Sequence, residues 1–496
     1  MSSSTTMRPS PIDSFPTPTS SAQAETEKIL LEHLPVGDNT AAPTLQKNAH
    51  MQYLIRNIVQ GFPARYTSQD ASQPWLMFWT LQAFSVLQVG LDPGNKQKAV
   101  ETIMAWQHPE GGFGGGPHQA AHLLPTYAAV CALAIAGKPG EGGGWDQIDR
   151  KKMYKFFMSL KQPDGSFLVA HHSEVDVRGI YCLLVTATLL DIITSELVEG
   201  TASFIASLQT YEGGFSSASQ PYYTPSSSAG GPSILLETPR PPLGEAHGGY
   251  TFCALASWVM LLPFLPSSSS ASQPKINKNS LLRWLVQMQG VPAELGGFKG
   301  RTNKLVDGCY SWWVGGAFAL LESIGINPAA VVPGAGAPTA EKQDGDDWDD
   351  IDDSLMNRKA LQEYILFAGQ HPAGGLRDKP PKHADAYHTL SCLAGLSSAQ
   401  HKVFPSPARR KELLDSWQAT ANSTNEDGLR KRVFTDALCY TEEEGTETIV
   451  GGAPNRVNAT HPLFNLTITH TEGMMAHFYK QTVPPRVFKR ATAGKP

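Results

Sequence analysis

The stretch Gln107-His-Pro-Glu-Gly-Gly-Phe113 decides the fold, because variants of it recur along the chain. Each copy starts with Gln, passes through a polar turn and a glycine corner, and ends in Phe or Leu between two apolar runs. The first two intervals, from Phe113 to Phe167 and on to Phe215, are 54 and 48 residues, and the later, longer ones contain inserts. The other copies are Gln162-Pro-Asp-Gly-Ser-Phe167, Gln209-Thr-Tyr-Glu-Gly-Gly-Phe215, Gln289 to Phe298, and Gln370-His-Pro-Ala-Gly-Gly-Leu376.

A repeat of about 50 residues with two apolar helices per unit predicts stacked helical hairpins. Kelch propellers have a similar period, but each of their units needs several short strands. The intervening runs, such as 126–135 and 250–265, are long and rich in Ala and Leu, which favours helices. We therefore expect an all-α fold in which about six hairpins close into an α–α barrel, or toroid.

Composition sets the expected domain limits. Residues 1–27 are rich in Ser, Thr and Pro and are expected to be disordered, and 28–480 should form one barrel followed by a tail at 481–496. Low-complexity or polar stretches at 216–242, 266–274, 328–353 and 421–456 should be disordered inserts. Residues 461–479 look structured again and are expected to close the ring.

The totals exclude several functional classes. A net charge of −5 and a pI near 6.3 show no excess of positive charge of the kind that nucleic-acid-binding proteins carry. The six cysteines are scattered without a CxxC pair, which indicates reduced thiols in a cytoplasmic protein. The N-terminal stretch lacks the apolar core of a signal peptide, and no run approaches the length of a membrane span.

Polar and titratable residues recur at the start of the helix that follows each glycine corner. If the hairpins close into a ring, these positions share one rim, and a purely structural repeat would place small or apolar residues there. The residues concerned are Thr126, Tyr127, Arg178, Tyr181, His247, Asp307, Cys309, Asp385, Tyr387 and His388.

Asp307, Cys309 and His388 are a candidate metal site. Together they offer O, S and N ligands and leave a fourth position open, as in catalytic zinc sites. Calcium and magnesium prefer oxygen ligands alone, so the mixed set favours zinc. A single Asp-Gly-Cys or a single His is more often structural, and only their common place in the repeat brings the metal hypothesis level with that alternative.

A second hypothesis is an anion site made by His247, Arg301, Lys304 and Tyr310, with His247 just before a glycine pair where backbone can approach a ligand. Taken alone, Arg301 and Lys304 are more typical of a solvated face. A third hypothesis is an aromatic wall suited to a long hydrocarbon, although most such residues pack in cores. Its candidates are Trp75, Trp79, Tyr181, Tyr250, Trp312 and Trp313.

Four stretches, taken together and in order, resemble the β subunits of protein farnesyltransferases over residues 50–400. They are Glu174-Val-Asp-Val-Arg178 with Tyr181, Glu245-Ala-His-Gly-Gly-Tyr-Thr-Phe252, Leu305-Val-Asp-Gly-Cys-Tyr-Ser-Trp312, and Asp378-Lys-Pro through Tyr387-His388. That family has an α–α barrel fold. The inserts and the long N-terminal stretch are unlike its animal members and indicate a fungal source.

The resemblance implies roles for individual residues. Asp307, Cys309 and His388 would hold one zinc ion, with Asp385 supporting them, and Asp378 would help to hold magnesium. His247, Arg301, Lys304 and Tyr310 would bind the diphosphate of farnesyl diphosphate, and Lys304 and Tyr310 would act in catalysis. The isoprenoid and peptide wall would be Trp75, Trp79, Tyr181, Tyr250, Cys253, Trp313 and Tyr387, with Arg178, Ser72 and His122 near the end of the peptide.

The implied reaction joins a farnesyl group to the cysteine thiol of a C-terminal CaaX motif, in a cytoplasmic heterodimer with a helical α subunit. Leu124 and Ser391 depart from the small residue and the aromatic that the family leads us to expect, which leaves the preference for the last CaaX residue open. The nearest alternative is a type I geranylgeranyltransferase β subunit, but a bulky Trp75 favours the shorter isoprenoid. A triterpene cyclase lacks support because the only Asp-rich run, 344–353, lies in an insert, and a non-enzymatic repeat scaffold would bind no zinc.

Overall fold

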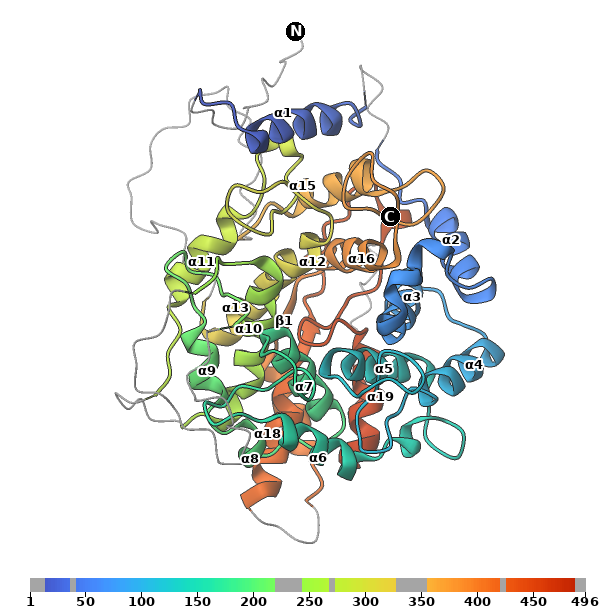
Figure 1. The fold of residues 1–496 in the computed structure, drawn as a ribbon, viewed down its shortest axis with the longest axis vertical. Coiled ribbons are helices and arrows are strands. Elements are labelled where there is room, and N and C mark those ends of the chain that lie inside the picture. Colours follow the sequence, from blue (N-terminus) through green and yellow to red (C-terminus); the bar gives the residue numbers. More distant parts are fainter. Residues whose placement is uncertain are drawn as a thin grey trace, which may run out of the picture.

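The computed structural model describes residues 14–35, 42–218, 243–266, 273–326, 355–419 and 425–486. These residues form two concentric rings of helices, as the sequence predicts (Figure 1). The inner ring is α3 (Gln73–Val86), α5 (Leu123–Ala136), α7 (Val177–Leu189), α10 (Gly248–Leu261), α12 (Tyr310–Trp313) and α16 (Ala386–Gln400). Each inner helix packs on the next, and α16 packs on α3, so the ring is closed.

Each inner helix has an outer partner that precedes it in the chain. The outer helices are α2 (Lys47–Val59), α4 (Pro93–Met104), α6 (Arg150–Leu160), α9 (Thr201–Ser207), α11 (Lys278–Gln287) and α15 (Arg358–Glu363). The inner helices are buried on nearly every side, which explains why their sequences read as continuous apolar runs. The six pairs confirm the predicted toroid of about six hairpins.

Shorter elements connect the hairpins. They are η1 (Ala64–Ser72), η2 (Trp145–Gln147), α8 (Ser195–Val198), η3 (Leu262–Phe264), η4 (Pro292–Glu294), η5 (Gly315–Ala317), α13 (Phe318–Leu321), η6 (Glu322–Ile324) and the π-helical η7 (Tyr364–Gly369). The apolar run 314–324 is divided among η5, α13 and η6.

The glycine corner lets each hairpin touch the next. Gly111 has φ +107°, and a Cβ there would lie 2.3 Å from the Lys152 carbonyl oxygen of α6, so only glycine fits. The repeat Gln then fixes the N-cap residue of the next outer helix: the Gln209 amide accepts from the Asn277 N–H (2.7 Å) and donates to its carbonyl (3.0 Å). Gln370 likewise accepts the Gln46 N–H (2.7 Å) and donates to the Thr44 carbonyl (3.0 Å), which ties the last hairpin to the first.

In the second corner the structure places Lys161, and not Gln162, at the position of the repeat Gln. Lys161 pairs with Phe167 in the same isolated bridge that Gln107 forms with Phe113. Its ammonium group bonds the carbonyl oxygen of Glu196. The sequence alignment of this corner was therefore one residue out of register.

The C-terminal region covers the end of the toroid where the inner helices finish. It contains β1 (Val403–Pro405), α17 (Pro407–Ser416), α18 (Asn425–Leu438), β2 (Tyr440–Glu442), which pairs antiparallel with β1, η8 (Ala453–Asn455) and α19 (Ile468–Tyr479). Helix α19 packs on α5 and α7, and the Tyr127 and Tyr181 hydroxyls donate to the carbonyls of Phe464 (3.1 Å) and Leu463 (2.9 Å). Residues 461–479 thus plug one end and do not close the ring.

Three expected boundaries differ from the structure. Helix α1 (Pro18–Leu31) occupies part of the stretch expected to be disordered, because Leu30 is fully buried against the barrel. The region 421–456 contains α18 and β2, so it is not simply a disordered insert. Arg486, in the expected tail, pairs with Glu472. The inserts expected at 216–242, 266–274 and 328–353 lie largely outside the described residues. Among the helices that the structure describes, none is long and apolar enough to cross a membrane.

Candidate metal and anion site

The starts of the inner helices gather at one rim, because backbone hydrogen bonds join each start to the corner loop of the next repeat. The N–H groups of Leu123, Gly248 and Gly308 donate to the carbonyls of Val169, Gly300 and Asp378, each at 2.8 Å. The residues at or just before the helix starts are Ser72, His122, Asp176, His247, Cys309 and Asp385. Four of these side chains, those of His122, Asp176, His247 and Asp385, accept a backbone N–H of their own helix, which explains polar residues at these positions.

Asp307, Cys309 and His388 meet at this rim, with ligand atoms that all lie within 4.8 Å of one another. Asp307 Oδ1 accepts the Cys309 N–H at 2.8 Å and lies 3.2 Å from His388 Nε2. The Cys309 side chain is almost fully buried, and burial raises the pKa of its thiol. The sequence therefore identified a trio that α12 and α16 bring together from 79 residues apart.

The surroundings of His388 are strongly negative. Its Nδ1 lies 2.6 Å from Asp385 Oδ2, on the side opposite Asp307. Burial alone would lower the pKa of His388, but the hydrogen bonds to Asp307 and Asp385 outweigh it and raise that pKa to about 12. Two carboxylates thus flank the imidazole ring, and their negative charge favours a cation at this place.

His247 and Tyr310 lie next to this trio. His247 Nδ1 accepts the Gly249 N–H (3.0 Å), so Nε2 carries the hydrogen and donates to the Tyr310 hydroxyl oxygen (3.0 Å). Burial, followed by the nearby guanidinium groups of Arg301 and Arg178, lowers the pKa of His247 to about 4. The imidazole is therefore a neutral donor at physiological pH. Tyr310 packs over Gly300, where any Cβ would collide with the phenol ring.

The two cations of the anion hypothesis are less tightly placed. Arg301 bonds the Glu245 carboxylate at the surface, and the Lys304 side chain is exposed. Asp378, expected at a magnesium site, is half-buried and ion-paired with Lys379 at 2.6 Å. Burial, with a further contribution from Asp307, raises the pKa of the Asp378 carboxyl.

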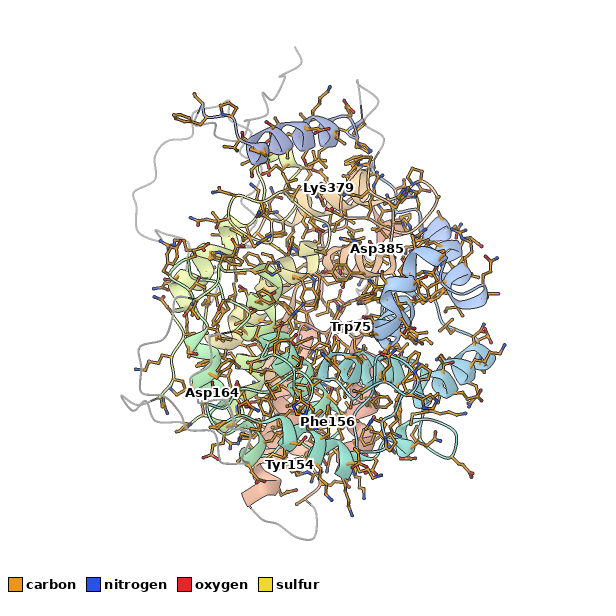
Figure 2. All side chains as sticks on the ribbon, viewed as in Figure 1. Trp75, Tyr154, Phe156, Asp164, Lys379 and Asp385 are labelled. Carbon is orange, nitrogen blue, oxygen red and sulfur yellow. The ribbon has the colours of Figure 1, made fainter. Side chains whose placement is uncertain are left out.

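Aromatic side chains form a closed belt around the inside of the toroid. Trp75, which lies on the inner side of α3 (Figure 2), stacks on Trp79 (5.5 Å) and Tyr127 (5.4 Å) between ring centroids. Further centroid contacts link Trp79 with Tyr387, Tyr127 with Tyr181, Tyr181 with Phe252, and Phe252 with Trp313, at 5.3–5.7 Å. The Trp313 indole N–H donates to the Tyr387 hydroxyl (2.7 Å), and this bond completes the belt with one member or more from every inner helix.

The remaining predicted residues occupy the same rim or wall. The Arg178 guanidinium lies over the Tyr250 ring (5.4 Å) and forms a bidentate pair with Asp176, whereas Cys253 is buried below them. Ser72 and His122 are half-buried at the starts of α3 and α5. Trp312, another aromatic-wall candidate, is fully buried and packs on the belt member Phe252 (5.2 Å between ring centroids).

A family model described as "Prenyltransferase alpha-alpha toroid domain" matches residues 45–466. A protein farnesyltransferase subunit β from Pyricularia oryzae is 35% identical over 79% of this chain and 71% of its own length. One from Schizosaccharomyces pombe is 36% identical over 71% of this chain and 78% of its own length.

The chain belongs to the protein farnesyltransferase β-subunit family.

The family is one of prenyltransferase enzymes, and this membership confirms the resemblance noted in the sequence. Among solved structures, a Candida albicans protein geranylgeranyltransferase-I complexed with GGPP aligns with a TM-score of 0.55 over 87% of this chain and 99% of that chain. At 17% identity, that likeness supports the toroid fold alone.

The sequence did not predict the roles of several residues at the rim and in the belt. Asp176, which pairs with Arg178, and Glu245, which pairs with Arg301, lie inside quoted motifs but received no role. Phe252 was not named as a wall residue, and Tyr127 was expected at the rim but not in the aromatic wall, yet both belong to the belt. The signal for Phe252 was present, because it stands in the α10 start motif two residues beyond Tyr250.

Proposed function

We propose that this chain is the catalytic β subunit of a protein farnesyltransferase, which transfers a farnesyl group from farnesyl diphosphate to the cysteine of a C-terminal CaaX motif. The observation that carries the proposal is the meeting of Asp307, Cys309 and His388 beside His247 and Tyr310, above a closed aromatic belt. A soft-metal ligand set, an anion-binding pair and an apolar wall are the three parts that such a reaction needs.

The proposed resident metal is one zinc ion. The ligand atoms are close enough for one ion to contact all three, the donors are O, S and N, and the Asp307 and Asp385 carboxylates lie on either side of the His388 ring. When bound, zinc would lower the pKa of a substrate thiol and so provide a thiolate near neutral pH. Asp385 would orient the His388 ring, as carboxylates commonly do for metal-bound histidines.

The diphosphate would lie against His247, Tyr310 and Arg301, with Lys304 supplied from the exposed loop. Charge grows on the oxygen that leaves carbon 1 of the isoprenoid, and fixed donors aimed at that oxygen lower the barrier. His247 and Tyr310 can act in this way as neutral hydrogen-bond donors, and Arg301 adds charge. Asp378 would hold magnesium against the diphosphate in exchange for its present partner, Lys379.

The isoprenoid would lie along the aromatic belt formed by Trp75, Trp79, Tyr181, Tyr250, Trp313 and Tyr387, with Cys253 beneath. Trp75 favours farnesyl over the longer geranylgeranyl, because its indole stacks on Tyr127 close to the plugged end and shortens the space available. A Trp75→Ala variant should gain use of geranylgeranyl diphosphate, whereas equal use of both by the parent chain would favour the type I geranylgeranyltransferase alternative.

The CaaX peptide would enter at the rim, with Arg178, His122 and Ser72 near its last residue. By family membership we infer a helical α subunit as partner and a cytoplasmic location for the heterodimer.

The test is transfer of labelled farnesyl from its diphosphate to a short peptide ending in CaaX, with zinc content measured on the same preparation. Cys309→Ala should lose both zinc and turnover. Cys439→Ala is the matched control, since Cys439 is also a buried thiol but lies beside Arg410 far along the chain. Full activity in Cys309→Ala would refute the role of Cys309 as a zinc ligand. A chain that, assayed together with its α subunit, holds no zinc and transfers nothing would overturn the proposal in favour of a repeat scaffold.

A further inference from the structure

Helix α1 and the turn after it touch both loops that carry the rim carboxylates. The helix packs across η4 at the outer edge of the molecule (Figure 1), with Leu30 fully buried. From the helix, the Gln23 amide donates to Glu294 Oε1 at 2.7 Å. From the turn, His33 Nε2 meets Arg377 Nη2 at 3.4 Å.

The Gln23 contact reaches the loop that leads to Asp307. The Glu294 side chain has no exposed surface, accepts the Val291 N–H (2.9 Å) and pairs with Lys299 (3.0 Å). Lys299 forms a β-bridge with Val306, the residue directly before Asp307. A buried carboxylate needs all its donors, so Gln23 helps to fix the geometry of this loop.

The His33 contact reaches the loop that carries Asp378. A guanidinium group can only donate, so His33 must accept at Nε2, and its Nδ1 donates to the Ile29 carbonyl at 2.8 Å. Arg377 is 6% exposed and also bonds the Ala368 carbonyl (3.1 Å). The next residue, Asp378, accepts the Gly308 N–H through its carbonyl, which joins the two loops beside Cys309.

We propose that residues 18–34 form a clamp that positions both rim loops, and through them Asp378 relative to Asp307, Cys309 and His388. Gln23 and His33 are positioning residues in this clamp, since neither touches the rim carboxylates themselves. Any effect of the clamp on diphosphate binding rests on the proposed function, whereas the contacts that form the clamp do not.

Hydrogen exchange of the full-length chain, in the heterodimer if it is obtained as one, tests the clamp without substrate. Gln23→Ala should accelerate exchange in residues 291–301, and His33→Ala in residues 376–386, by about tenfold, as expected for loss of one bond to a charged group. His33→Gln should restore protection, because its side chain keeps an acceptor and a donor. Gln97→Ala is the control, since Gln97 makes a similar pair of bonds on α4, to Glu101 and the Gly142 carbonyl, away from the rim.

Unchanged exchange in both loops, or a parent chain whose residues 18–31 exchange as fast as an unfolded peptide, would overturn the clamp. If the parent chain transfers farnesyl, His33→Ala should raise KM for farnesyl diphosphate several-fold with a smaller effect on kcat. If the exchange differences appear in a chain that transfers nothing, the clamp stands and the proposed function fails.

Discussion

Helices α7 and α12 begin with a carboxylate in the same structural position, but different groups neutralise the two charges. Asp176 follows the bridge residue Val175 and accepts the N–H two residues on at 2.8 Å, and Asp307 follows Val306 and does the same at the same distance. Asp176 is satisfied by its own helix, because Arg178 pairs with it at 2.6 Å. In the place of Arg178, α12 has Cys309, and Asp307 pairs instead with the His388 imidazole from α16.

One repeat can in this way provide both a stabilising helix cap and the ligands of the proposed metal site. The corner needs an acceptor for the helix N–H groups, and Asp supplies it in both hairpins. Where the chain supplies its own guanidinium, the carboxylate is structural. Where the chain supplies a thiol and an imidazole instead, we propose that the same carboxylate shares a bound cation with them.

Replacing each of these two carboxylates with Asn should have very different consequences for zinc content, and this is the largest effect we expect. Asp307→Asn keeps an acceptor for the Cys309 N–H but removes the charge, so zinc content should fall from about one per chain to near zero and transfer by at least about 100-fold. Asp176→Asn should keep its zinc. Mass-spectrometric metal analysis of both variants checks this, and equal zinc loss in the two would break the comparison.

A smaller effect is expected from the carboxylate that supports the trio without belonging to it. Asp385→Asn keeps a cap for α16 but no longer fixes the His388 ring through its charge, so zinc affinity should weaken by about 10–100-fold. Competition with a chelator of known affinity measures this change. An affinity equal to that of the parent chain would mean that Asp307 and Cys309 orient the ion unaided.

At the other helix start the prediction concerns stability and not metal. Arg178→Met leaves Asp176, whose side chain is 8% exposed, without its cation, and should lower the free energy of unfolding by about 1–2 kcal/mol. The value lies at the lower end for a buried pair because the Arg178 side chain is 47% exposed. Denaturant unfolding gives the difference, and the zinc content of this variant should remain at the parent value.

The sequence was sufficient to predict the toroid and the proximity of Asp307, Cys309 and His388, because both depend on a local motif repeated in register. It was not sufficient where the partner comes from a distant segment. Nothing near Gln370 indicates that it bonds Gln46, nothing near His33 indicates Arg377, and the polar composition of 425–438 hides a helix that packs on the inner helix α10. The second corner was misaligned because Lys161 can reach a backbone carbonyl where the other repeats use Gln.

The smallest expected effect tests a third helix start, that of α10, through the pH dependence of stability. The pKa of His247 falls from an ordinary 6.5 to about 4 on folding, so the unfolded chain binds this proton first as the pH drops. The contribution of His247 to stability is therefore complete above pH 6.5 and is lost between pH 6.5 and 4. His247→Gln removes the titrating group while keeping a donor and an acceptor, so the free energy of unfolding should fall less steeply over that window than in the parent chain. Denaturant unfolding at pH 7 and pH 4.5 gives the change in unfolding free energy with pH for both proteins. Equal changes in the two would mean that His247 titrates in the folded chain as it does in water. That result would contradict the neutral donor that its bonds to Gly249 and Tyr310 require.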